Sequence, residues 1–105
     1  MHNILDYIPE GKENAILVNR LAMTLGISSR AVKKMVQKLR DGGMVILSSA
    51  EGGYFIPSND NEGLKEVNRY IKMMERQAMS RFDRVRSARR WREEYKQESI
   101  ENRLK

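Results

Sequence analysis

The chain has 105 residues and a formal net charge of +6, with 40% hydrophobic and 32% charged residues, one histidine and no cysteine. This length favours one domain with an added element, and the lack of thiols excludes disulfides and thiolate metal sites. No nucleophile–base set, carboxylate pair, phosphate loop or metal-ligand spacing is visible, so we expect neither enzymatic activity nor a cofactor.

Positive charge gathers in the second half of the chain, where residues 65–92 carry ten basic and three acidic side chains. Such an excess favours a polyanionic partner, and nucleic acid before an acidic membrane. The longest apolar runs, such as residues 44–47, are too short to span a bilayer, and no signal peptide pattern is present. We therefore expect a soluble, cytoplasmic protein with no membrane contact.

The first predicted elements are short. Apolar side chains at Ile4, Leu5 and Ile8 indicate a brief helix that ends at Pro9. Residues 14–17, which are apolar after Asn14, then indicate a short strand. Because these two elements are short, we expect the later segments to supply most of the side chains of the hydrophobic core.

The next helix is predicted over about residues 18–25, with Leu21 and Leu25 four apart on one face. Its start is weakly signalled, because Leu17 offers no capping side chain. Its end is clear, because Gly26 can adopt the left-handed conformation that closes a helix without steric cost.

A second amphipathic helix is predicted over residues 29–40, with Ser28 as its N-cap. Apolar residues recur in it at i, i+3, i+4 and i+7, which gives one buried stripe. The stripe consists of Val32, Met35, Val36 and Leu39. The opposite, polar face presents Arg30, Lys33, Lys34 and Gln37, with Ser29 and Lys38 beside it.

Two amphipathic helices joined at a glycine are the pattern of a helix-turn-helix, whose second helix can enter the major groove of DNA. Arginine and lysine pair with phosphates or guanine, and glutamine pairs with adenine. We therefore expect double-stranded DNA as the partner, with Ser29 and Lys38 contacting phosphates. The alternative is a charged helix face that is only solvated.

A β-hairpin is predicted directly after this pair of helices. Residues 44–48 and 54–56 read as strands around turn residues 50–53, and Pro57 closes the second strand. The fold class is therefore mainly α with a small β-hairpin, a winged helix-turn-helix followed by a long C-terminal helix. The wing tip carries Glu51, which would repel phosphate, so we expect the hairpin to complete the core rather than contact DNA.

The chain resembles the winged helix-turn-helix of the biotin operon repressor, and still more the small helix-turn-helix proteins of phages and prophages of Gram-positive bacteria. The resemblance covers about residues 4–58. It is carried by Glu13-Asn14-Ala15-Ile16, Leu25-Gly26-Ile27-Ser28 with Arg30 and Val32, Leu39-Arg40 with Gly43, and Gly53-Tyr54-Phe55-Ile56-Pro57. It implies a DNA-binding regulator. The chain departs from the pattern at Leu17, where such families often have a polar cap, and at the acidic wing tip.

A long helix is predicted from Asn59, which forms a capping box with Glu62, to about residue 88. One face of this helix carries an apolar stripe with steps of three and four residues. The apolar stripe consists of Leu64, Val67, Ile71, Met74, Ala78, Phe82 and Val85. We expect a homodimer through this stripe; a helix folded back on the head and a tail that orders on binding are the alternatives.

These assignments divide the chain into three regions. Residues 1–58 form the winged helix-turn-helix head, residues 59–88 form the dimerisation helix, and residues 89–105 form a charged tail whose helix can fray. The densest basic cluster lies around the last boundary, where a solvated face and contact with the DNA backbone explain it equally well. The candidate backbone contacts are Arg81, Arg84, Arg86, Arg89 and Arg90, with Arg92 beside them.

The sequence thus favours a homodimeric, sequence-specific transcriptional regulator of phage or prophage type. No small-molecule ligand is expected, because no separate ligand domain is visible. One alternative is a protein that recognises a replication origin or a DNA-packaging site. Another is a protein-interaction module in which the winged helix is a scaffold, which the acidic wing tip favours and the basic helix face opposes.

Overall fold

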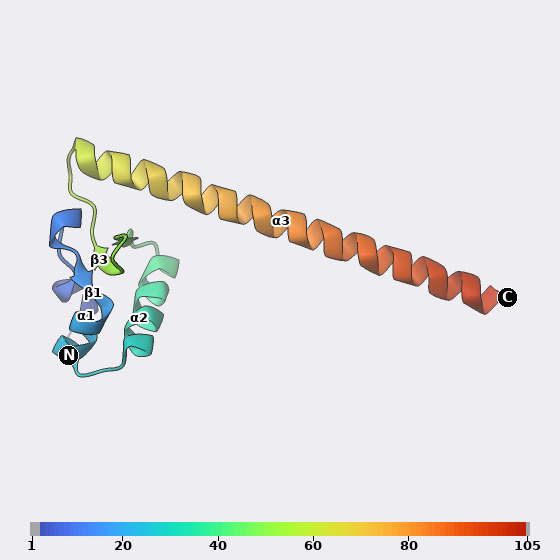
Figure 1. Cartoon of the computed structure of the whole chain (residues 1–105), viewed down its shortest axis with the longest axis horizontal. Coiled ribbons are helices and arrows are strands. Elements are labelled where there is room, and N and C mark those ends of the chain that lie inside the picture. The colour runs from blue at the N-terminus through green and yellow to red at the C-terminus, as the bar shows by residue number, and fades with distance from the viewer. Residues whose placement is uncertain (1–2, 105) are drawn as a thin grey trace. The chain divides into compact units, whose positions relative to one another are not determined.

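The structure of the protein is a computed structural model that describes residues 3–104. The described chain divides into two compact units, the first ending at Tyr70 and the second beginning at Ile71. The first unit holds every element up to the first turns of α3 (Asn61–Leu104), and the second unit is the remainder of that helix (Figure 1).

The first unit begins with two 3-10 helices, η1 (Ile4–Tyr7) and η2 (Lys12–Asn14), which lead into β1 (Ile16–Leu17). The short helix expected near Ile4 is therefore present as η1, where the Asn3 side chain accepts a hydrogen bond from the backbone N–H of Leu5 at 3.1 Å. The strand expected over residues 14–17 is shorter, because Asn14 completes η2.

The helix-turn-helix consists of α1 (Val18–Leu25) and α2 (Ser29–Asp41). Gly26 closes α1 in the left-handed conformation, at φ 67° and ψ 33°, as its position predicted. Ser28 then caps α2, since its hydroxyl oxygen accepts a hydrogen bond from the backbone N–H of Ala31 at 3.1 Å. Both helix ends at the corner are thus satisfied, which fixes how α2 leaves α1.

The wing is part of a three-stranded antiparallel sheet in the order β1-β3-β2, formed with β2 (Leu47–Ser48) and β3 (Gly53–Phe55). In its register Ile16 lies opposite Tyr54, and Leu47 lies opposite Phe55. The hairpin strand β2 is shorter than the predicted residues 44–48. One physical reason is that the carbonyl of Ile46 accepts a hydrogen bond from Arg40 at 2.9 Å instead of a strand partner.

One hydrophobic core joins the two helices, the sheet and η1. Its fully buried side chains are Leu21, Val32, Val36 and Ile46, and Ile4, Ile8 and Tyr54 pack with them. The predicted stripe of α2 is therefore correct at its centre. At its edge Met35 remains 38% exposed, because it lies about 100° around the helix from the buried Val36.

The start of α3 differs from the predicted capping box. Asp60, not Asn59, is the capping residue, since its carboxylate accepts a hydrogen bond from the backbone N–H of Gly63 at 2.9 Å. The hydroxyl of Ser58 donates to the same oxygen at 2.8 Å. These hydrogen bonds, first the Gly63 backbone N–H and then the Ser58 hydroxyl, lower the pKa of the Asp60 carboxyl.

The helix α3 runs to Leu104 and does not end near residue 88, where the failing apolar stripe led us to expect its end. The sequence contains neither glycine nor proline after Gly63, so nothing in it breaks the helix. Ion pairs between neighbouring turns add support, as between Arg86 and Asp83 at 3.8 Å and between Lys96 and Glu93 at 3.9 Å.

Candidate nucleic-acid interface

The outer face of α2 is opposite the stripe that packs into the core. Val32 and Val36 are completely buried on the inner side, whereas Arg30, Lys34 and Gln37 recur at i, i+4 and i+7 on the outer side and are exposed. Lys33 and Lys38 are also exposed and flank that row. The helix therefore presents a mainly cationic surface about two turns long.

The cations of this face are not engaged within the protein. Among the residues that the structure describes, none forms an ion pair or a hydrogen bond with the side chains of Arg30, Lys33, Lys34 or Lys38. Their charges are thus available to a polyanion, and no intramolecular contact must break before they bind phosphates.

Ser29 has a structural partner that the sequence did not reveal. Its hydroxyl donates a hydrogen bond to the side-chain oxygen of Asn19 at 2.9 Å, which joins the first turn of α2 to the first turn of α1. The two residues are ten positions apart, so no local pattern pairs them. Ser29 is half-buried and helps orient α2, while its contact with a phosphate stays a prediction.

Gln37, the candidate for adenine recognition, is held by the end of its own helix. Its amide nitrogen Nε2 donates a hydrogen bond to Oδ1 of Asp41 at 3.0 Å. Asp41 follows Gln37 by one turn and is exposed on the same face, so it brings a negative charge to the C-terminal end of the cationic surface. Because this nitrogen carries two hydrogens, Gln37 can keep the hydrogen bond to Asp41 and still offer one donor and its amide oxygen to a base.

Arg40 contributes to the site without belonging to its outer face. Its Nε donates to the carbonyl of Ile46 at 2.9 Å, and its Nη2 donates to the hydroxyl of Ser48 at 3.1 Å. Its guanidinium carbon also lies 5.5 Å from the centre of the Tyr54 ring. Arg40 therefore fixes the C-terminal end of α2 against the wing.

The tip of the wing is a tight turn between β2 and β3. The backbone N–H of Ser49 donates to the carbonyl of Gly53 at 2.7 Å, and that of Gly52 donates to the carbonyl of Ser49 at 3.0 Å. Glu51 is exposed at this tip, whereas Leu47, Tyr54 and Phe55 are buried. The inner side of the hairpin thus completes the core, and its tip offers an acidic group.

The two helices and the wing match a known protein family. Residues 1–55, just over half of the chain, match the family model described as HTH domain. The chain belongs to this family. It is a DNA-binding helix-turn-helix domain with a small sheet as its wing, followed by a long helix. No curated protein and no solved structure matches the chain.

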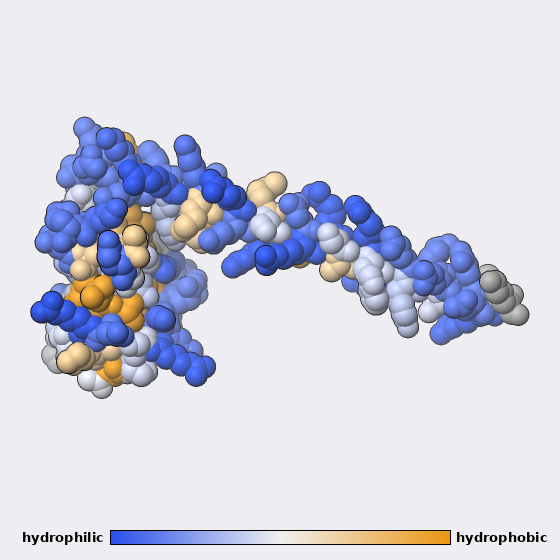
Figure 2. All heavy atoms as spheres, viewed as in Figure 1, coloured by the Kyte–Doolittle hydropathy of each residue, from blue (hydrophilic) through white to orange (hydrophobic). Residues whose placement is uncertain are grey.

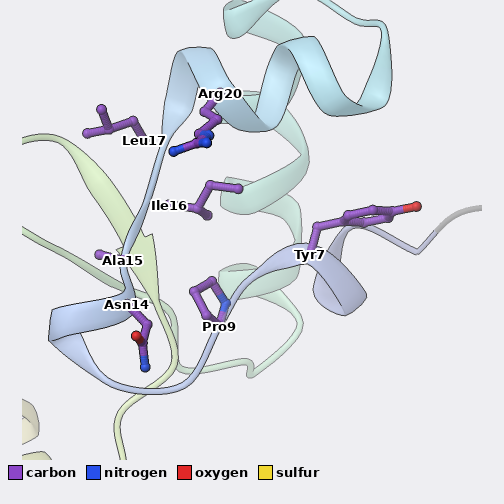
Figure 3. A pocket seen from close by; sticks show the side chains of 7 residues that line it. All are labelled: Tyr7, Pro9, Asn14, Ala15, Ile16, Leu17 and Arg20. Carbon is purple, nitrogen blue, oxygen red and sulfur yellow. The ribbon is translucent and has the colours of Figure 1, made fainter.

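The helix-turn-helix domain also has a shallow depression of about 480 Å³ near the start of α1 (Figure 3). Pro9, Ala15 and Ile16 supply apolar walls, and Arg20 and Asn14 supply polar groups. In Figure 3 the labelled side chains lie around the strand and do not converge on one point. The depression therefore lacks the arrangement of polar groups that typifies a small-molecule site.

In the second unit the arginine cluster is exposed along α3. Arg86 pairs with Asp83 at 3.8 Å and Arg92 with Glu93 at 3.8 Å, and both pairs lie in solvent. Such exposed pairs contribute little to stability and leave the cations accessible. Contact of this cluster with the DNA backbone stays a prediction.

Within residues 3–104, no group of three or more His, Cys, Asp and Glu side chains is placed to hold a metal ion. No helix in this part of the chain combines the length and the apolar character that crossing a bilayer requires.

Proposed function

We propose that this helix-turn-helix domain is a sequence-specific transcriptional regulator, of the kind found in phages and prophages, that inserts α2 into the major groove. The observation that carries this proposal is the set of exposed cations on α2 for which the described part of the chain offers no ion pair, namely Arg30, Lys33, Lys34 and Lys38. Arg30 and Gln37 lie on its centre line and would contact base edges, while Lys38 lies at its border and would contact a phosphate. A regulator that binds DNA is consistent with the cytoplasmic location expected from the sequence.

The network behind α2 supports the same role. Recognition of bases requires a helix held in a fixed orientation, since hydrogen bonds to base edges are directional. Ser29 with Asn19 holds one end of α2, and Arg40 with the wing holds the other. This arrangement favours direct readout over a loose electrostatic association.

A titration of the full chain with duplex DNA over a range of salt concentrations tests the proposal. The affinity should fall steeply with salt, and each lost phosphate contact should reduce the log–log slope by roughly 0.9. Lys38→Ala should therefore lower the slope by about one contact. Lys96→Ala, which removes an exposed lysine elsewhere on the chain, is the matched control and should leave the slope nearly unchanged.

A protein-interaction module is the second candidate, and the exposed Glu51 at the wing tip is the observation that favours it. The same titration separates the two. If no duplex binds at low salt, DNA recognition through α2 is wrong and the interaction module takes its place. Selection of preferred sequences from random duplexes would then separate a regulator from a protein bound to an origin or a packaging site.

A further inference from the structure

The second unit leaves its part of the apolar stripe in water. Within α3 the side chains of Ile71, Met74, Phe82 and Val85 are 45%, 43%, 66% and 47% exposed. Figure 2 shows apolar side chains scattered among hydrophilic ones along this helix. Most helices in proteins depend on packing of an apolar face for their stability, so this stretch of α3 requires a partner.

The spacing of these residues reads the same in both directions. From Ile71 the steps to Met74, Ala78, Phe82 and Val85 are three, four, four and three residues. A two-fold axis at Ala78 would therefore place Ile71 of one helix across from Val85 of an antiparallel copy. The same axis would set Met74 across from Phe82, so that each apolar side chain of this segment meets another apolar side chain.

Ala78 at the centre suits such an axis. It is the smallest residue of the stripe, and two alanines that meet on a two-fold axis let the helix backbones approach closely. The larger side chains then pack on either side of the axis. A second copy of the same chain is thus an occupant whose apolar residues match this surface at each stripe position from Ile71 to Val85.

The distribution of charge distinguishes the antiparallel arrangement from the parallel one. Residues 81–92 carry six arginines and one aspartate. In a parallel pair this segment would lie beside itself. In an antiparallel pair centred on Ala78 it would lie beside residues 64–75, which carry three basic and two acidic side chains. Like charges that face each other along paired helices are destabilising, so charge opposes the parallel arrangement.

We propose that a second copy of this chain covers the stripe from Ile71 to Val85, with the two α3 helices antiparallel and related by a two-fold axis at Ala78. This surface is distinct from the outer face of α2. The proposal goes beyond DNA binding and does not depend on it, because the interface can be measured without DNA.

Single cysteines test the arrangement directly, because the native chain contains none. A disulfide requires Cα atoms about 4.4–6.8 Å apart. In the antiparallel pair the two copies of residue 71 would be separated by 14 residues of helix, or about 21 Å. Ile71→Cys and Val85→Cys should therefore each stay uncross-linked alone, whereas their equimolar mixture should form the disulfide.

Two further variants complete the experiment, which is run on the full chain in a glutathione redox buffer. Ala78→Cys should cross-link alone and shift the mass from 12.3 kDa to twice that value. Ser80→Cys, on the opposite side of α3, is the matched control and should remain at 12.3 kDa. Light scattering on the wild-type chain gives the mass without any substitution.

The outcomes separate the possibilities. A disulfide in the mixture alone supports the antiparallel pair. A disulfide from Ile71→Cys by itself shows a parallel pair and overturns the proposal. Monomeric wild-type protein at tens of micromolar, with no disulfide from Ala78→Cys, overturns the second copy altogether. None of these results alters the duplex titration, so failure here and failure of DNA binding are distinguishable.

Discussion

Arg40 lies over the ring of Tyr54, with its guanidinium carbon 5.5 Å from the ring centre. The two residues come from the last turn of α2 and the central strand β3, and Tyr54 is only 7% exposed. The same guanidinium donates to the carbonyl of Ile46 and the hydroxyl of Ser48. One side chain therefore joins the helix proposed to read DNA to the whole wing.

Arg40→Lys keeps the charge but removes the planar group that makes these contacts together. We expect the free energy of unfolding to fall by about 1–3 kcal/mol, the range for hydrogen bonds to charged groups. Chemical denaturation followed by circular dichroism measures this change. Lys38→Arg, on the exposed side of the same turn, should change stability by less than about 0.5 kcal/mol. Equal stability of both variants would show that Arg40 has no structural role.

Gly63 is buried in the first turn of α3, and a Cβ atom there would collide with the carbonyl oxygen of Ser58. Alanine normally stabilises a helix interior by about 1 kcal/mol relative to glycine. At this position we expect the opposite sign, a loss of about 1–3 kcal/mol, because the backbone of Ser58 must move.

Thermal unfolding of Gly63→Ala measures that change, and Ser80→Ala in the exposed middle of α3 is its control. The control should be neutral or slightly stabilising, since alanine is the better helix former. A Gly63→Ala variant that melts above the wild type would mean that the chain before α3 can shift freely.

The cap of α3 should give the protein a pH dependence in acid. The pKa of Asp60 is lowered in the folded state, so this group contributes stability that is fully present above the unfolded value of about 3.9. That contribution should be lost as the pH falls through the lower, folded pKa. Asp60→Asn keeps a capping oxygen without this titration, so the stability difference between wild type and variant should shrink below about pH 4. Asn59→Ala should retain the wild-type profile.

Local rules were sufficient to predict the corner of the helix-turn-helix. Gly26, Ser28 and the α2 stripe depend on the conformational freedom of glycine, on capping and on helical periodicity, all of which act within a few residues. The start of α3 was missed by one residue because Asn59 and Asp60 are both good caps. Only the position of Ser58 in the fold selects Asp60.

The contacts that orient the candidate site could not be predicted in the same way. Ser29 meets Asn19, and Arg40 meets Ile46, only after the chain has folded back at the corner or the turn. The late end of α3 was missed for another reason. Loss of the apolar stripe after Val85 predicts an earlier end of the helix, whereas helix-forming residues continue to Leu104 and ion pairs continue to Lys96.

The proposed base contact of Arg30 and the proposed phosphate contact of Lys38 predict different effects on sequence specificity. Arg30→Ala should relax the preferred DNA sequence at one base position, at a cost of about 1–3 kcal/mol in discrimination. Lys38→Ala should weaken binding to all sequences alike. Selection from random duplexes with each variant measures both effects. An unchanged preferred sequence for Arg30→Ala would assign base recognition to other residues.

Asp41 provides the last prediction, because it places a carboxylate on the outer face of α2 and accepts the hydrogen bond of Gln37. In a DNA complex this carboxylate would lie near phosphates and would repel them. Asp41→Asn removes the charge and keeps a side chain of the same size. We expect tighter duplex binding, by about 0.2–1 kcal/mol as for other exposed charge interactions. The gain should shrink at high salt, because exposed charges are screened there.

Glu101→Asn, which removes an exposed acid near the end of α3, is the control for net charge alone and should give a smaller gain at the same salt. If the two variants gain equally, net charge explains the effect and the DNA does not approach the C-terminal turn of α2.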